Sequence, residues 1–565
     1  MEFSESRRHR AGAGRAGYRW VFAVMLALCL GVTSQASATR DRLDDAIDKA
    51  LVDLAVLTET AAVADGAVFE ALGHLYSTED RDLIWPDRAR SKAVFDAAMA
   101  AVEAHGLVAA DYPIAGLETL FDQGRMTVND TARRDVLLTL TVARFAQQVR
   151  YGRLDPRSIS EILDYPVRTG DLARSVRFVA AAPGKAAERL DALAPTHPGY
   201  HDLKDLLARS RVEADRGGWP VPEAGPTLRP GQEDPRVLAL HQRFGTIGGL
   251  LYGPENNQTF DARLVAAVEE FQTRNGLDVD GVIGPMTYRA LAISADDRVR
   301  QIEMNMERWR WLPATLGHHH IFVNVPDYHI DIVEDGRLIK RMPSIVGRAD
   351  RQTPIFSSRL TWLEFNPTWT VPERIAELDI LPALIEDRDY LIDRRIRMYS
   401  SWRKDASQLM TRFIDWESMG KDIHRYRLRQ DPGPQNPLGR VKFMMANNFS
   451  IYLHDTNQRN LFGKHTRSLS AGCVRVEDPR WLASHLMQMP ELLDPEFEND
   501  YFSESWETKR VSLKRSMPIH LAYFTIWSDD GDRTEIRPDI YDFDARMADA
   551  WDQAPQPAIS LAALP

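Results

Sequence analysis

The chain has 565 residues, of which 44% are hydrophobic, a share typical of soluble globular proteins and a length that suits roughly three or four domains. Its formal net charge is −11 and its pI is about 5.8, so the charge balance gives no support for nucleic-acid binding. No fixed-period repeat is visible, which argues against a solenoid or a coiled coil.

Residues 1–38 are predicted to be a signal peptide that directs export. Five arginines between residues 7 and 19 precede an apolar run at residues 21–30, and the small residues 36–38 offer a cleavage site. The apolar run is short for a membrane span. An uncleaved segment would instead act as a membrane anchor, and that alternative stays open.

The cysteine count points to a working thiol. The chain holds two cysteines, Cys29 inside the signal segment and Cys473. Cleavage would leave Cys473 alone, and a lone cysteine in an oxidising compartment has no intramolecular partner. Cys473 is therefore a candidate nucleophile.

Residues 39–224 are predicted to form an all-α scaffold domain. Apolar residues at 43–54 and again at 138–149 recur with helical spacing, and Gly152 follows the second run as a helix terminator. No catalytic spacing occurs in this region, and its purpose is left open.

Residues 225–294 are predicted to form a compact three-helix module after a Pro- and Gly-rich linker. The string F-Q-T-R-N-G-L-D-V-D-G-V-I-G-P-M-T at residues 271–287 resembles the signature of the small peptidoglycan-binding domain. That resemblance implies a module that binds the cell wall.

Two patterns suggest a metal, but each is better explained by ordinary structure. Asp278 and Asp280 before Gly281 hint at a calcium loop, yet the remaining ligands and the closing Glu are missing, so a turn is expected. The three consecutive histidines at residues 318–320 cannot easily converge on one ion, and they suit a strand entry. No metal or organic cofactor is predicted.

From about Arg298 to residue 500 the pattern favours strands. Alternating apolar residues at 321–332, followed by Glu-Asp-Gly at 334–336, predict a hairpin. A charged segment at about 373–429 is predicted to be mainly helical and separates two β-rich stretches. Residues 501–565 are expected to supply a closing strand and a C-terminal tail.

Cys473 and His454 form the candidate catalytic pair. They lie in S-L-S-A-G-C-V-R at residues 468–475 and in I-Y-L-H-D-T at residues 451–456. The thiolate attacks, while the imidazole accepts the proton and returns it to a leaving group. The backbone N–H groups of Gly472 and Cys473 are candidate oxyanion donors, because glycine lets the backbone approach closely.

The two strings resemble the catalytic motif of the L,D-transpeptidases, a histidine followed after a loop by S-x-G-C-x-R. The match is close to the large periplasmic type, which adds a helical domain, a wall-binding domain and a lid. The resemblance implies an α+β multidomain protein whose β-rich catalytic domain spans residues 298–500, with a lid at 373–429. It also implies a periplasmic location and a role in cell-wall organisation and cell shape.

The same resemblance implies acyl transfer on peptidoglycan stem peptides. Cys473 would attack the carbonyl of the third residue of a tetrapeptide donor, a diamino acid, and expel the terminal D-alanine. The side-chain amine of a second stem would then take the thioester and give a 3→3 crosslink. Carbapenems acylate this family's cysteine, and other wall-synthesis proteins are candidate partners.

Three further residues are candidates for binding substrate. Arg475 is suited to bind a carboxylate bidentately or to brace the loop through carbonyls. Tyr452 suits either the lining of the donor pocket or simple packing. Asp455 is a candidate to orient His454, although a strand would turn it to the other face, so a main-chain carbonyl is at least as well suited.

Other functions remain open. A papain-like thiol hydrolase usually places its cysteine before its histidine, whereas His454 comes first here. A same-fold hydrolase, either an L,D-carboxypeptidase or a lipoprotein–peptidoglycan amide hydrolase, would share the acyl-enzyme. A non-catalytic wall-binding scaffold would use residues 225–294 and would keep its function after alkylation of Cys473.

Overall fold

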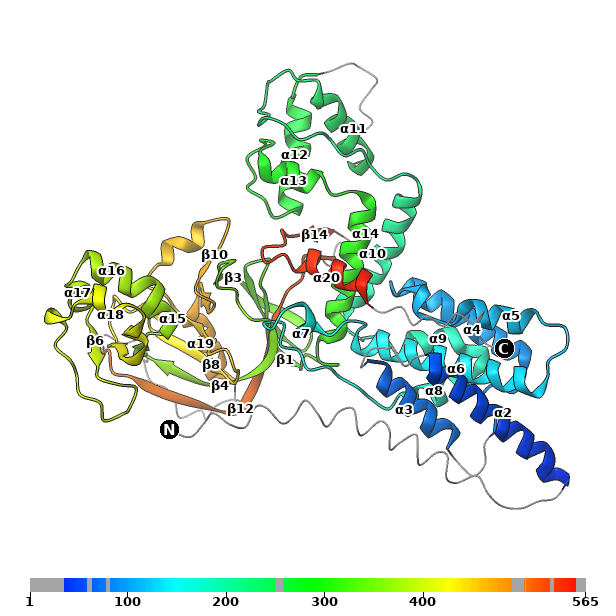
Figure 1. The fold of residues 1–565 in the computed structure, drawn as a ribbon. Coiled ribbons are helices and arrows are strands. Elements are labelled where there is room, and N and C mark those ends of the chain that lie inside the picture. The colour runs from blue at the N-terminus through cyan, green and yellow to red at the C-terminus, as the bar shows by residue number, and fades with distance from the viewer. Residues whose placement is uncertain are drawn as a thin grey trace.

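The structure is a computed structural model, shown in Figure 1, and it describes residues 35–57, 64–77, 82–248, 258–489, 502, 505–528 and 533–554. Most of the predicted signal peptide, Cys29 included, lies outside the described residues. Among those residues, no helix has both the length and the apolar character that a membrane crossing needs. The architecture is α+β and multidomain.

The N-terminal region is an all-α scaffold arranged around one long helix, α6 (Val128–Tyr151). Thr127 and Asp130 form a capping box at its start, and Gly152 ends it with a positive φ of 94°. Other scaffold helices are α2 (Gln35–Leu57), α3 (Ala64–Tyr76), α4 (Arg88–Ala104), α5 (Ile114–Asp122), α7 (Pro156–Ile159), α8 (Leu172–Ala180), α9 (Ala186–Asp191) and α10 (Pro198–Asp215). Because α2, α3, α4, α5 and α8 all contact α6, almost every α6 residue from Ala132 to Val149 is buried.

A separate three-helix module follows, as predicted. It consists of α11 (Arg236–Gly248), α12 (Ala262–Arg274) and α13 (Pro285–Leu291), and its core is its own. The Asp280 carboxylate accepts a hydrogen bond from the Val282 N–H at 2.9 Å, and Gly281 has a φ of 64°. The expected turn is therefore present at this place.

The expectation of strands from Arg298 is wrong, because residues 295–311 form helix α14 (Ala295–Trp311). Ser294 and Asp297 cap its start, and the helix packs along α10 and against the C-terminal helix α20 (Phe543–Gln553). Its apolar face is hard to see in the sequence because charged side chains of α14 are buried as well.

The β-rich region forms a nine-stranded sheet in the order β10-β3-β11-β9-β8-β4-β12-β1-β2. Its strands are β1 (His319–Asn324), β2 (His329–Glu334), β3 (Arg337–Gly347), β4 (Phe356–Phe365), β8 (Val441–Met445), β9 (Leu453–His454), β10 (Ser468–Ser470), β11 (Val474–Val476) and β12 (Lys509–Ala522). Because β2 also pairs with β3, the pairings form a closed circuit. The predicted hairpin is confirmed, with Asp335 and Gly336 at positive φ between β2 and β3.

The segment predicted to be mainly helical is only partly so. It contains short helices, α15 (Glu373–Ile375), a π-turn (Ala376–Ile380), α16 (Leu381–Glu386), α17 (Tyr390–Asp393) and α18 (Trp416–Met419). Two strands, β6 (Ile396–Tyr399) and β7 (Arg427–Gln430), also belong to it. They form a three-stranded sheet with β5 (Trp369–Thr370), which lies just before the segment and pairs with β7. A separate apolar core around the buried Trp416 holds this insertion together.

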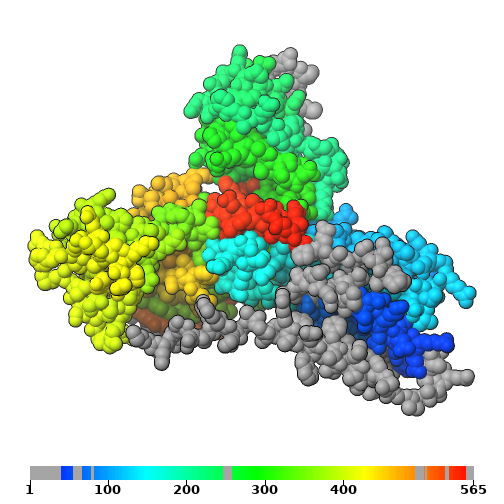
Figure 2. Space-filling model, viewed as in Figure 1, coloured from blue at the N-terminus to red at the C-terminus, as the bar shows by residue number. Residues whose placement is uncertain are grey.

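The C-terminal region completes the sheet and then returns to α14. The expected closing strand divides into β12, which lies between β4 and β1, and β13 (Ile526–Ser528), which pairs with β14 (Thr534–Ile536). Helix α19 (Pro479–Gln488) follows the cysteine motif. In Figure 2 the C-terminal segment lies between the three-helix module and the scaffold.

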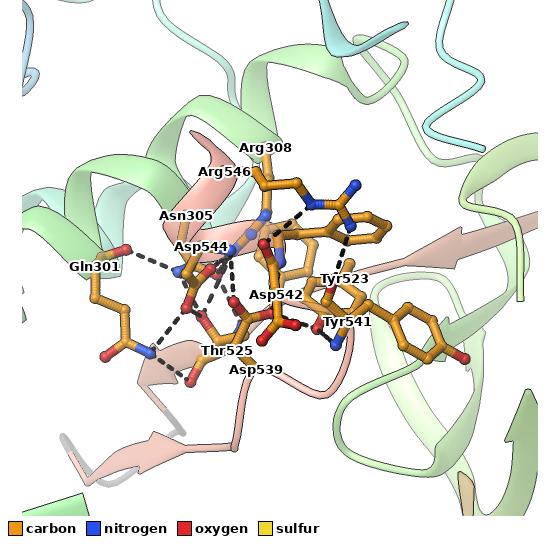
Figure 3. Close-up of polar contacts among 12 residues, drawn as sticks. Gln301, Asn305, Arg308, Tyr523, Thr525, Asp539, Tyr541, Asp542, Asp544 and Arg546 are labelled. Carbon is orange, nitrogen blue, oxygen red and sulfur yellow. Dashed lines mark hydrogen bonds and ion pairs between the residues drawn. The ribbon is translucent and has the colours of Figure 1, made fainter. Parts of the chain in front are cut away.

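A buried polar network fixes this C-terminal segment on α14, as Figure 3 shows. Arg308 forms an ion pair with Asp544 at 2.5 Å, and Asn305 donates to the Thr525 hydroxyl at 2.9 Å. The Tyr523 hydroxyl donates to Asp539 at 2.5 Å. Helix α14, which comes before the nine-stranded sheet in the chain, is therefore joined to the segment that comes after the sheet.

A second buried network joins the scaffold to the same helix. One oxygen of Glu307 accepts the N–H groups of Arg153 and Leu154 at 2.6 and 2.8 Å, and the other accepts from Arg310 at 2.8 Å. The side chains of Glu307 and Arg310 are fully buried. The opposite charges of Glu307 and Arg310 therefore compensate each other at a position that water does not reach.

Candidate active site

The strand pairing brings the predicted catalytic residues onto one face of the sheet. In the parallel ladder between β11 and β9, Val474 lies opposite Leu453 and Arg475 lies opposite His454. Because side chains alternate along a strand, Cys473, just before β11, falls beside Tyr452 on the same face as His454. The sheet register thus brings together the two residues that the sequence motif predicted to act together.

The loop before Cys473 is fixed by its own side chains. Gly472 has a φ of 119°, a region that favours glycine, and a Cβ there would lie 3.3 Å from Ile451 Cδ1. The Ser470 hydroxyl donates to the Cys473 carbonyl at 2.6 Å and accepts the Gly472 N–H at 3.1 Å. Since the Gly472 N–H is engaged inside the loop, the Cys473 N–H is the remaining donor of the predicted oxyanion pair.

His454 is buried, with 5% of its surface exposed, and it is held as a neutral imidazole. Its Nδ1 donates to the main-chain carbonyl of Asp455 at 2.5 Å, which leaves Nε2 as the basic nitrogen. Burial, aided by the charges of Arg475 and Lys442, lowers the His454 pKa to about 3, although nearby carbonyls act in the opposite direction. The imidazole is therefore uncharged at neutral pH.

The Asp455 carboxylate points away from the imidazole. It accepts hydrogen bonds from the backbone N–H groups of Arg440 and Thr456, each at 2.7 Å, and pairs with Arg459 at 2.7 Å. Of the two expected ways to orient His454, the structure uses the main-chain carbonyl. The carboxylate holds together the loop that follows β9.

The Cys473 thiol is half-buried and protonated at neutral pH. Burial raises its pKa to about 11, opposed by the Tyr452 backbone and by the Arg475 charge. The described contacts include no hydrogen bond between Cys473 Sγ and His454. With both groups neutral in the free protein, the thiol proton must leave before or during attack on substrate.

Arg475 and Tyr452 flank the pair. Arg475 Nη1 donates to the Gln458 side-chain oxygen at 2.9 Å, a partner that neither expectation included, and its buried Nε has no partner among the described residues. The Tyr452 ring meets His454 edge-on, with centroids 5.7 Å apart. Burial holds the pKa of Tyr452 well above its usual range, so the phenol stays protonated.

Sequence reasoning missed a charged pair on the same face. Lys442 lies opposite His454 in the β8–β9 ladder and pairs with Glu364 of β4 at 3.2 Å. The Lys442 ammonium also lies 5.7 Å from the ring centres of Tyr452 and Trp362. The available signal was a lone cation inside the apolar string V-K-F-M-M.

The insertion at residues 373–429 is fastened beside the thiol loop. Both terminal nitrogens of Arg351 bind the Asp379 carboxylate, and Arg374 donates to the Asp350 carbonyl at 3.0 Å. The carbonyl of Gln352 would lie 3.5 Å from a Cβ placed on Gly472. The insertion and the nucleophile loop therefore share one supporting segment, residues 347–353.

Metal-ligand clusters and cavities offer no further site around Cys473 and His454 among the described residues. Within the described ranges, no group of three or more His, Cys, Asp or Glu side chains is arranged to hold a metal ion. A cavity of about 360 Å³ opens near Asp455 but includes neither Cys473 nor His454; its lining residues are Arg440, Asp455, Arg459, Asp478, Pro479, Arg480 and Phe502.

Family models match three parts of the chain. A model described as "L,D-transpeptidase catalytic domain" matches residues 318–503, and one described as "Scaffold domain" matches residues 70–207. A third, described as "Putative peptidoglycan binding domain", matches residues 233–291. The three matches follow the order of the scaffold, the three-helix module and the sheet.

A Haemophilus influenzae protein named "Putative L,D-transpeptidase" is 36% identical over 248 residues, which is 44% of this chain and 49% of that protein. The chain thus spans about half the length of this curated relative. Solved structures match more weakly. An L,D-transpeptidase from Mycobacterium smegmatis has a TM-score of 0.18 and 11% identity over 36% of this chain and 58% of its own. One from Xylanimonas cellulosilytica has a TM-score of 0.17 and 17% identity over 53% and 99%.

Proposed function

Because the chain belongs to the L,D-transpeptidase family, we propose that it forms 3→3 crosslinks between peptidoglycan stem peptides through a thioester on Cys473. The observation that carries this proposal is the β11–β9 register, which sets Cys473 and His454 on one face. The wall-binding match at residues 233–291 supports peptidoglycan as the substrate.

In the first half-reaction, Cys473 Sγ attacks the carbonyl carbon of the third stem residue as its proton passes to His454 Nε2. The negative charge that develops on the carbonyl oxygen is met by the Cys473 N–H. When the intermediate collapses, the bond to the terminal D-alanine breaks, and its amine leaves with the proton from His454. A thioester remains on Cys473.

In the second half-reaction, the side-chain amine of another stem attacks the thioester and gives its proton to His454. The C–S bond breaks, and His454 returns the proton to the sulfur, so the free thiol is restored. The neutral Nδ1–H tautomer fits both halves, since Nε2 must accept before it donates.

Substrate binding is proposed for the polar groups around the pair. Arg475 offers a buried Nε–H that suits a stem carboxylate, and Tyr452 lines the face beside Cys473. The Lys442–Glu364 pair offers both signs of charge next to His454. The insertion at 373–429 is proposed to cover the bound stem as a lid.

The location and the other domains follow from the same proposal. Residues 1–38 are proposed to direct export to the periplasm, where the module at 225–294 holds the wall near the thiol. Residues 39–224 act as the scaffold, and residues 298–500, completed by 501–565, form the catalytic domain. Thiol chemistry of this kind needs no cofactor.

The first test is the intact mass of the purified protein after mixing with a carbapenem, alongside Cys473→Ala. A stoichiometric adduct that the variant lacks is expected. No adduct on correctly folded protein would contradict the proposal and favour the wall-binding scaffold.

A second candidate is a hydrolase of the same fold, because water can take the same thioester in place of an amine. Tetrapeptide stem fragments separate the first two functions: a crosslinked dimer is expected from a transpeptidase, whereas tripeptide alone would indicate an L,D-carboxypeptidase. A lipoprotein–peptidoglycan conjugate tests the third, because release of the lipoprotein from it would indicate the amide hydrolase.

A further inference from the structure

The peptide bond between Gly472 and Cys473 is fixed by a hydrogen bond from a residue that is far away in the sequence. The Thr353 hydroxyl donates to the Gly472 carbonyl at 2.8 Å and accepts the Gly347 N–H at 2.8 Å. Thr353 is fully buried, so water does not compete for either bond. The hydroxyl therefore ties the nucleophile loop to the end of β3.

Tyr541, from the C-terminal segment, fixes Thr353 in turn. Its hydroxyl donates to the Gly347 carbonyl at 2.6 Å and accepts the Thr353 N–H at 3.1 Å. Burial raises the Tyr541 pKa to about 12, so the phenol keeps the proton that it donates. One phenol thus bridges both ends of the 347–353 segment.

The C-terminal network anchors Tyr541 itself, as Figure 3 shows. Its backbone N–H donates to the Tyr523 hydroxyl at 2.8 Å, and that hydroxyl donates to Asp539. Asp539 also accepts the N–H groups of Phe543 and Asp544 at 2.9 and 2.7 Å. A continuous series of buried and partly buried hydrogen bonds therefore runs from α20 to the thiol loop.

The geometry of one peptide unit explains what this series achieves. In a trans peptide the C=O and N–H bonds lie in one plane and point in opposite directions. The Gly472 carbonyl and the Cys473 N–H belong to the same peptide. Because Thr353 binds that carbonyl, the Cys473 N–H of the same peptide must point away from Thr353.

We propose that Thr353 and Tyr541 are positioning residues that set the Cys473 N–H as the oxyanion donor. The inference rests on the proposed acyl transfer and adds two residues to it. It also gives residues 523–544, all of which lie beyond the matched catalytic domain, a part in the chemistry. Neither residue touches substrate.

The test compares Thr353→Val, which keeps the shape but removes the hydroxyl, with Thr353→Ser, which keeps the hydroxyl. Acylation by a carbapenem builds an oxyanion, whereas alkylation by iodoacetamide does not. Thr353→Val is expected to slow acylation about tenfold or more, with alkylation within about twofold of wild type. Thr353→Ser is expected to restore most of the acylation rate.

Two other variants complete the design. Tyr541→Phe removes the bridging hydroxyl and should also slow acylation selectively, which keeps the inference testable if Thr353→Val does not fold. Thr361→Val is the matched control, since Thr361 makes a similar bond to the Met444 carbonyl elsewhere in the sheet. Its acylation rate should equal that of wild type.

The outcomes separate the two proposals. If wild type itself is not acylated, the proposed function fails, and the positioning role fails with it. If wild type is acylated and both Thr353→Val and Tyr541→Phe match it, only the positioning role is overturned. A parallel fall in acylation and alkylation, or a Thr353→Ser variant as slow as Thr353→Val, would likewise overturn it.

Discussion

Arg475 lies directly opposite His454 in the parallel ladder that joins β11 to β9. The guanidinium adds to burial in lowering the His454 pKa, and it opposes the rise in the Cys473 pKa. The Arg475 charge therefore favours both the neutral form of the His454 imidazole and the ionised form of the Cys473 thiol.

Replacing Arg475 by Met should move both titrations upward. The His454 pKa, now about 3, should rise toward its ordinary value of 6.5, because a positive charge beside it is lost. Activity needs the neutral imidazole, so the acid limb of the acylation profile should shift to higher pH, by about one unit. The control is Lys185→Met, at an exposed scaffold position, which should leave the acid limb in place. An unmoved acid limb in Arg475→Met would contradict the effect of the Arg475 charge on the His454 pKa.

The thiol of the free protein should behave as a protonated group. Because burial raises its pKa to about 11, the rate of iodoacetamide alkylation should climb about tenfold per pH unit from pH 6 to 10. The adduct is mapped by mass spectrometry, with Cys473→Ala as the control. A plateau below pH 8 would instead indicate a preformed thiolate–imidazolium pair.

The bond between Arg351 and Asp379 should restrain the insertion. Arg351 is almost buried while Asp379 is 42% exposed, so the pair is within reach of solvent and salt. Asp379→Asn should speed alkylation of Cys473 severalfold by loosening the segment at 373–429. Asp405→Asn breaks an exposed pair with Arg403 in the same insertion and should have no effect. Equal rates in both variants would argue against the restraint.

Removing the buried charge of Glu307 should destabilise the protein strongly. Glu307→Ala leaves the buried Arg310 guanidinium without its carboxylate and two backbone N–H groups without an acceptor. The free energy of unfolding should fall by about 3–5 kcal/mol, measured by urea denaturation. Glu270→Ala removes only an exposed pair with Arg274 and should cost less than about 0.5 kcal/mol.

The elements with one clear apolar face were predictable from sequence. In α6, Leu138 and Val149 follow the 3.6-residue period, and Gly152 marks the end as expected. Helix α14 was not predictable in this way. Its buried side chains include Asn305, Glu307 and Arg310, whose partners come from other parts of the chain. A buried helix with paired charges lacks the apolar stripe that marks a helix.

The residues of the candidate site also divide into those that the sequence indicated and those that it did not. Cys473 and His454 stood in local strings with a chemical meaning, so their pairing could be anticipated. Thr353 and Tyr541 lie 119 residues before Gly472 and 194 residues after Gly347, respectively, and each looks like an ordinary buried residue. The orientation of His454 depended on a main-chain carbonyl, which carries no side-chain signal.

The place of β12 has a consequence for how the protein is made. The ribosome delivers β1 and β4 early, yet the strand that pairs with both is complete only at Ala522. Cys473 is therefore synthesised before the sheet that holds it can be completed by β12. Until then the edges of β1 and β4 that pair with β12 are open, and open strand edges can pair with other chains. The sheet that holds the candidate nucleophile can therefore close only when the chain is complete as far as Ala522.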